Sequence, residues 1–156
     1  MKFEIPIPEG YKIATFDQST GKGEFLEIPK SIMQRIKTVD DVLAEWDIDK
    51  KEFDEIYKGF MEDEKAYKLI KLLVKTLNEG WEPNWDDGDQ CKYFPYFYMG
   101  GSSGFRFHDC GAWRSSSVVG SLLCFKSHEL AEYAGKQFAD LYKEFMIINY
   151  NATCKS

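Results

Sequence analysis

Two residues in the second half of the chain, His108 and Cys110, have the side chains of a base and a thiol nucleophile. In a β-strand, residues two positions apart point to the same face, so this imidazole and this thiol would be neighbours. A nearby imidazole lowers the pKa of a thiol and activates it for hydrolysis or acyl transfer. The reaction also requires a group that orients the base and an oxyanion hole, and no motif supplies either. We therefore expect a non-enzymatic protein and keep a small Cys/His hydrolase or acyl transferase as the alternative.

Metal ligands occur in the same region, but their spacing matches no metal-binding motif. The nitrogen and sulfur candidates are Cys91, His108, Cys110, Cys124 and His128. Structural zinc sites use closely spaced pairs of such ligands, and this chain has no Cys-x-x-Cys pair. The acidic loop Trp81–Gln90 offers oxygen ligands, but it lacks the alternating acids and the distal Glu of an EF-hand. We therefore predict neither a metal ion nor another cofactor.

An aromatic run, residues 93–113, holds eight Phe, Tyr and Trp side chains among twenty-one residues. Within it, Tyr96, Tyr98 and Arg106 would form a stacking surface for a base, a sugar ring or an aromatic residue of a peptide. The simpler interpretation, which the sequence favours, places the aromatic side chains in the core with the arginine extending past them. The glycine-rich link at residues 100–104 is a hairpin connection and not a phosphate-binding loop, because a strand follows it.

The first part of the chain contains the signals of a hairpin followed by short helices. Residues 11–28 alternate apolar and polar side chains around a turn rich in Ser, Thr and Gly, which predicts a β-hairpin. Thr38 is followed by two aspartates and an apolar pair, a pattern typical of a capped helix. A further short helix is expected over residues 50–60, where aromatic and aliphatic side chains recur every three to four positions.

From residue 64 onward, the pattern predicts a long helix, three strands and a second long helix. The first helix has an apolar stripe and ends at Gly80, which suits a left-handed C-terminal position. The strands are expected over Cys91–Met99, Phe105–Trp113 and Ser116–Phe125, and their short connections imply antiparallel neighbours. Ser127 is expected to cap a long final helix.

Alternation along the first of these strands leaves apolar or amphipathic residues on both faces of the sheet. One face carries Tyr93, Pro95, Phe97 and Met99, and the other carries Phe94, Tyr96 and Tyr98. Two helices on one side cover only one face. The second face therefore needs a cover from the hairpin, from the acidic helices or from another molecule.

These elements predict an α+β fold: an antiparallel three-stranded meander flanked by helices, with an N-terminal β-hairpin and an acidic segment of short helices. The length of 156 residues fits a single domain, residues 1–156. Within it we distinguish a hairpin region (1–30), an acidic helical segment (31–63) and a helix–meander–helix core (64–150).

The net charge of −6 is concentrated in the acidic segment, because residues 38–64 hold eleven acidic residues and three lysines. The chain contains no block of Lys and Arg, so we do not expect it to bind duplex nucleic acid. Binding of single-stranded nucleic acid through Tyr96, Tyr98 and Arg106 stays a second alternative. The chain shows no signal peptide and no apolar run of membrane-spanning length, which predicts a cytoplasmic protein without a membrane partner and with reduced cysteines.

Three blocks of the sequence carry a resemblance. They are residues 75–85 (KTLNEGWEPNW), residues 92–97 (KYFPYF) and residues 119–142, which begin VGSLLCFKS. In these blocks, and more broadly over about residues 64–145, the chain resembles a family of uncharacterised proteins from phages, prophages and mobile elements of gut anaerobic bacteria. The resemblance implies a phage or prophage setting, in the host-cell cytoplasm or the phage particle. It brings no known reaction, cofactor or catalytic residue.

The preferred hypothesis is therefore a phage-associated accessory or structural protein that acts through protein–protein interaction or self-association. It depends on the two-sided aromatic strands, on the acidic segment and on the lack of a catalytic motif. Under the enzyme alternative, the protein would be a Cys/His enzyme of phage origin.

Overall fold

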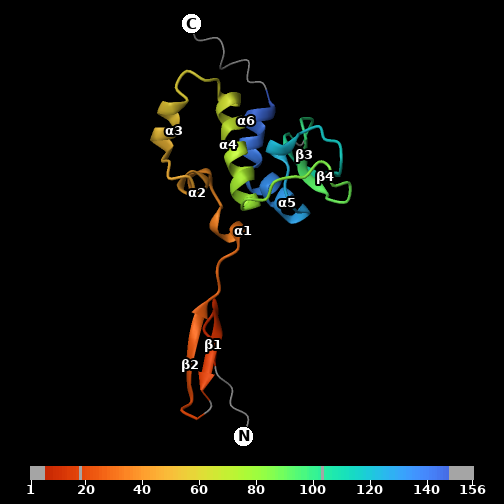
Figure 1. Ribbon diagram of the computed structural model, residues 1–156. Coiled ribbons are helices and arrows are strands. Elements are labelled where there is room, and N and C mark those ends of the chain that lie inside the picture. The colour runs from red at the N-terminus through yellow and green to blue at the C-terminus, as the bar shows by residue number, and fades with distance from the viewer. Residues whose placement is uncertain (1–5, 18, 103, 148–156) are drawn as a thin grey trace. The chain divides into compact units, whose positions relative to one another are not determined.

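The computed structural model describes residues 6–17, 19–102 and 104–147. The chain divides into two compact units, Met1–Ser31 and Ile32–Ser156. Their elements, labelled in Figure 1, are helices and two separate two-stranded antiparallel sheets. The predicted α+β class is thus confirmed.

The first unit contains the predicted hairpin, formed by β1 (Tyr11–Asp17) and β2 (Lys22–Glu27). The Asp17 carboxylate organises its turn by accepting hydrogen bonds from the Ser19 N–H and the Thr20 hydroxyl, both at 2.8 Å. Such a bond from an aspartate to the backbone two residues ahead mimics a backbone turn. Every described residue of the two strands is exposed, so this hairpin buries none of them.

Three short helices begin the second unit: α1 (Ile32–Arg35), α2 (Val39–Ala44) and α3 (Lys50–Ile56). The predicted cap at Thr38 is present. Its hydroxyl accepts a hydrogen bond from the Asp41 N–H at 3.1 Å, and the Asp41 carboxylate accepts one from the Thr38 N–H at 2.8 Å. This reciprocal pair satisfies donors that a helix start otherwise leaves without a partner, which explains why α2 begins here.

The long helix α4 (Glu62–Asn78) lies at the centre of the core. Its apolar stripe is buried as predicted, and the residues are Ala66, Ile70, Leu73, Val74 and Leu77. Glu79 and Gly80 then take positive φ angles of 49° and 83°, so the helix ends where the sequence indicates. In Figure 1, α4 lies beside α6 (Ala139–Met146), and the rings of Tyr67 and Phe145 stack between them at 5.3 Å.

The expected third strand is absent over the described residues 116–125, so the three-stranded meander is wrong. This segment instead forms one 3-10 turn, Ser121–Leu123, and a single antiparallel bridge between Tyr93 and Phe125. Asn78 holds the end of this segment from the other side. Its side-chain amide donates to the Cys124 carbonyl at 2.9 Å and accepts from the Lys126 N–H at 3.0 Å. The backbone of Phe125 between them pairs with Tyr93, so residues 124–126 are fixed between the end of α4 and β3.

The expected single final helix is also wrong, because the structure breaks it into α5 (His128–Gln137) and α6. The predicted cap is correct, since the Ser127 hydroxyl accepts from the Leu130 N–H at 3.3 Å. The break falls at Phe138, which has φ −113° and ψ 27° and is buried. Neither proline nor glycine stands at this position, and the Phe138 ring packs in the core.

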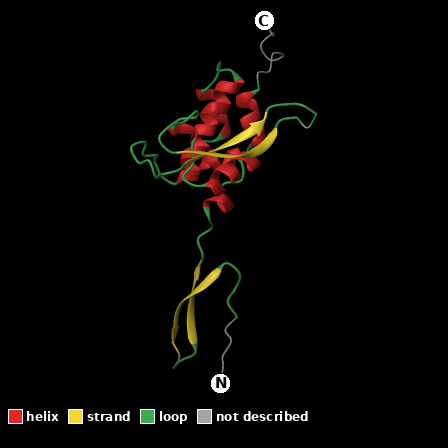
Figure 2. Cartoon of the chain, turned by 90° about the vertical axis from the view of Figure 1, so that its right-hand side faces the viewer, coloured by secondary structure: helices red, strands yellow, loops and turns green. Residues whose placement is uncertain are grey.

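The second sheet pairs β3 (Lys92–Tyr98) with β4 (Arg106–Trp113). Figure 2 shows this strand pair lying across one side of the helices. Helix α5 packs on it closely, because a Cβ atom at Gly135 would lie only 2.5 Å from Phe107 Cδ2. The core therefore sits between α4, α5, α6 and one face of this sheet.

We expect Asn78→Ala to lower the free energy of unfolding by about 2–4 kcal/mol. The substitution leaves the Cys124 carbonyl and the Lys126 N–H without their side-chain partner at a position only 4% exposed. Chemical denaturation followed by circular dichroism measures the change. Asn84→Ala, in an exposed loop, is the matched control, and equal losses in the two variants would contradict the role of Asn78.

Candidate functional site

The β3–β4 sheet contains one extra residue on β4, and this residue decides what each face carries. Tyr98 pairs with Arg106 and Phe97 with Phe107, but the next pair is Tyr96 with Asp109, which leaves His108 as a bulge. An extra residue reverses the alternation of side chains beyond it. Residues after the bulge therefore point to the opposite face from the one that simple alternation predicts.

The bulge separates His108 from Cys110. The thiol of Cys110 lies on the core side, with Sγ 4.0 Å from the His128 carbonyl oxygen, whereas the imidazole of His108 stacks with tyrosines on the other face. Burial, followed by the carboxylates of Glu132 and Asp109, raises the pKa of Cys110 to about 11. The expected shared face is therefore wrong, and this pair lacks the geometry of a nucleophile and its base.

Four side chains on the outer face form a stack, which we call the aromatic column: Arg106, Tyr98, His108 and Tyr96. The Arg106 guanidinium lies 3.9 Å from the Tyr98 ring centroid, and the His108 ring lies 4.0 Å from the same centroid at an interplanar angle of 8°. Two planar groups this close to one centroid overlap sterically if they share a side, so they cover opposite faces of the Tyr98 ring. The Tyr96 and His108 rings are next to each other in the column, with 5.0 Å between their centroids and an interplanar angle of 55°.

A second stack continues the same outer face toward the other end of the sheet. Trp113 lies parallel to Phe94, with 6.3 Å between ring centroids. The Phe94 ring covers Gly111 on the neighbouring strand so closely that a Cβ atom there would lie 2.5 Å from Phe94 Cζ. Glycine is therefore the residue that lets this ring lie flat on the sheet.

The two faces of the sheet differ in exposure. On the inner face, Phe97 is buried, and its ring centroid lies 4.9 Å from that of Tyr142 and 6.2 Å from that of Phe107. On the outer face, Tyr96 and Tyr98 are each 40% exposed and Trp113 is 41% exposed, whereas Phe94 beside them is only 9% exposed. The structure thus brings Tyr96, Tyr98 and Arg106 together, and the interpretation that all these rings belong to the core is wrong for the two tyrosines.

Lys92 positions the loop beside this sheet, although no pattern in the sequence indicates this role. The side chain is 1% exposed, and its Nζ donates to the carbonyl oxygens of Gln90 at 2.8 Å and Asp87 at 3.2 Å. It also lies 5.2 Å from the ring centroid of Trp85. Lysine at the start of a strand is usually exposed, so its burial follows only from the path of the loop.

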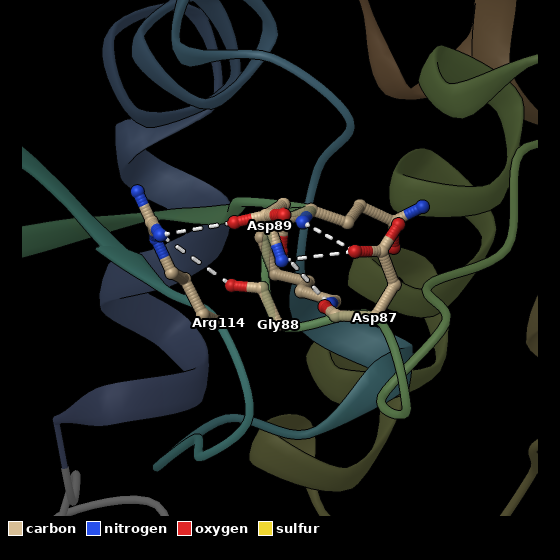
Figure 3. Close-up of polar contacts among 6 residues, drawn as sticks. Asp87, Gly88, Asp89 and Arg114 are labelled. Carbon is tan, nitrogen blue, oxygen red and sulfur yellow. Dashed lines mark hydrogen bonds and ion pairs between the residues drawn. The ribbon is translucent and has the colours of Figure 1, made fainter.

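The acidic loop is held by its own hydrogen bonds, as Figure 3 shows. The Asp87 carboxylate accepts from the Asp89 N–H at 2.9 Å and from the Gln90 N–H at 3.2 Å. Arg114 closes the loop, with one guanidinium nitrogen 3.5 Å from both the Gly88 carbonyl and the Asp89 carboxylate. The Asp87 carboxylate thus serves the local turn.

The nitrogen and sulfur side chains considered as zinc ligands form no common site in the part of the chain that the structure describes. Cys124 is buried with Sγ 3.6 Å from the Ser121 carbonyl, Cys110 faces α5, and His108 belongs to the aromatic column. Among all described residues, no three His, Cys, Asp or Glu side chains gather in a way that could hold a metal ion.

Comparison with protein-family models, with curated proteins and with solved structures gives no match. Over the described residues, no helix combines the length and the apolar character that crossing a membrane requires.

We expect the alkylation rate of Cys110 to rise with pH up to about 11, well above the inflection of an ordinary thiol. Burial favours the protonated form, so little thiolate is present at neutral pH. Mass-spectrometric mapping of iodoacetamide adducts against pH measures this. The same peptide in urea is the control, and an inflection below pH 8 in the folded protein would revive the nucleophile hypothesis.

Proposed function

We propose that this chain is a non-enzymatic, phage-associated accessory or structural protein that binds another protein through the outer face of the β3–β4 sheet. The observation that carries the proposal is the exposed aromatic column beside Trp113. Tyr, Trp and Arg are the side chains most enriched among residues that dominate the binding energy of protein interfaces.

The stacking makes this face a prepared binding surface. Tyr98 is fixed between Arg106 and His108, and Phe94 is fixed between Gly111 and Trp113. Side chains that are already ordered lose less conformational entropy when a partner binds. The buried inner face, with Phe97 in the core, supports the surface from below.

Arg106 indicates what the partner presents. Its guanidinium covers the Tyr98 ring, and no described carboxylate is within ion-pairing distance of it. A stacked guanidinium keeps its N–H edges available for bidentate bonding to a carboxylate. We infer that the partner is a protein segment that carries an Asp, a Glu or a C-terminal carboxylate beside an apolar side chain.

The same geometry disfavours single-stranded nucleic acid. A base stacks on the free face of an aromatic ring, but both faces of Tyr98 are already covered. Asp109 lies beside Tyr96 on the neighbouring strand, and the net charge of −6 opposes a phosphate chain. The phage setting is supported by the resemblance of residues 64–145 and stays part of the proposal.

We expect Arg106→Glu to reduce capture of the partner by about 30-fold, which is the loss typical of a strong interface residue. The assay uses the full tagged chain in lysates of infected or lysogenic cells, with captured proteins quantified by mass spectrometry. Lys58→Glu makes the same charge change at an exposed position on another side of this unit and should capture normally. Equal capture by both variants, or capture of nothing by the wild-type chain, would contradict the proposal.

We expect fluorescent single-stranded oligonucleotides to show no binding even at low salt, because both faces of the Tyr98 ring are covered and the column contains only one arginine. Fluorescence anisotropy over a range of ionic strengths measures this. Binding that weakens as salt rises, and that disappears in Tyr98→Ala, would favour the nucleic-acid alternative.

A further inference from the structure

The hairpin of the first unit has one apolar face, and a bulge creates it. Ile13 pairs with Phe25, but the next pair is Thr15 with Glu24, so Ala14 is an extra residue on β1. The bulge returns Phe16 to the face that carries Ile13 and Phe25. That face carries four large apolar side chains, Tyr11, Ile13, Phe16 and Phe25, which are 37–42% exposed, and it ends at Glu27 opposite Tyr11. The opposite face carries Lys12, Thr15, Asp17, Lys22, Glu24 and Leu26.

A two-stranded hairpin with no buried residue is marginally stable in water, and a third strand with a shared apolar face stabilises it. The outer edge of β1 offers unpaired backbone N–H and C=O groups for such a strand. Neither β1 nor β2 contains a proline that would block pairing.

We propose that a second copy of this chain fits it, with the two β1 strands pairing antiparallel around a twofold axis between Ala14 and Thr15. In that register, Ile13 lies opposite Phe16 of the second copy, and Lys12 lies opposite Asp17 of the second copy. Symmetry repeats each pair, so the interface contains two apolar pairs and two pairs of opposite charge.

The bulge is what makes this register consistent. In a regular strand, the side chains of residues 13 and 16 point to different faces of the sheet. Pairing residue 13 with residue 16 of the second copy would then place their side chains on different faces, where they could not touch. With the extra residue, Ile13 and Phe16 share the apolar face, while Lys12 and Asp17 share the other. All four members of the two pairs therefore meet on matching faces.

Asp17 is suited to its place in this pairing. Hydrogen bonds from Ser19 and Thr20 hold the pKa of its carboxyl at about 2, so the group stays ionised throughout the neutral range. Because the pair with Lys12 is exposed, its main effect is to select the register and the partner.

The edge of β2 offers no register with both apolar and opposite-charge pairs. A twofold axis at Glu24 places the two glutamates opposite each other, and an axis at Phe25 places Leu26 opposite Glu24. An axis at Gly23 pairs Lys22 with Glu24 but brings no two apolar side chains together. Pairing through β1 instead gives a four-stranded sheet, β2–β1–β1–β2, with one continuous apolar face. Such a sheet passes the size at which strands with a shared apolar face become independently stable.

Sedimentation velocity of the full chain over a range of concentrations tests the proposal. The wild-type chain should reach twice the protomer mass of 18.1 kDa as concentration rises. Lys12→Glu places like charges opposite each other twice and should weaken the dimer by about tenfold or more. Lys12→Arg keeps the charge and should dimerise normally. Lys30→Glu, the same charge change outside the strands, is the matched control.

The outcomes separate this proposal from the partner-binding face of the second unit. A chain that stays monomeric at every concentration, or a dimer that Lys12→Glu leaves unchanged, would overturn pairing through β1. A dimer that dissociates in Arg106→Glu but persists in Lys12→Glu would place self-association on the aromatic column instead. Retained far-UV circular dichroism in each variant shows that the fold is intact.

Discussion

The extra residue in β4 is the constraint on which the arrangement of the second unit depends. Because His108 is bulged, Cys110 turns toward α5, while Gly111 and Trp113 turn outward. Without that reversal, Gly111 would not lie under the Phe94 ring, and the outer face would lack its second stack. One inserted residue thus determines which side chains face the core and which face outward. It also places the His108 imidazole and the Cys110 thiol on different faces of the sheet.

Alternation predicted the faces of β3 because that strand contains no insertion. The outward positions of Tyr96 and Tyr98, beside the inward Phe97, follow directly from the period of two. The same rule failed on β4 after His108, since a bulge of this kind has no required residue type. Capping was predicted well at Thr38 and Ser127, because the hydrogen bonds involved join residues only three positions apart.

The remaining differences arise from contacts between residues far apart in the chain. Ser116–Phe125 has a composition compatible with a strand, but Asn78, more than forty residues earlier, binds the backbone on either side of Phe125. Lys92 is buried because two loop carbonyls and the Trp85 ring surround its ammonium group. The final helix breaks at Phe138, although local propensity would continue it. Local patterns contain no information about such partners.

Both units contain a two-stranded sheet with a β-bulge, but the exposed faces of the two sheets differ in character. In each sheet a bulge sets which aromatic side chains share the exposed face, through Ala14 in β1 and His108 in β4. In the second unit, Arg106 and His108 cover the two faces of the Tyr98 ring. Tyr98 therefore presents its ring edge and hydroxyl group to a partner. In the hairpin, Phe16 lies over Gly23, and Tyr11, Ile13, Phe16 and Phe25 are all exposed, so this surface stays apolar. Ring edges and a guanidinium group are suited to a partner that presents hydrogen-bond acceptors. An apolar face beside an unpaired strand edge is suited to a second copy of the same hairpin. This difference is the reason why we propose partner binding for the second unit and self-association for the hairpin.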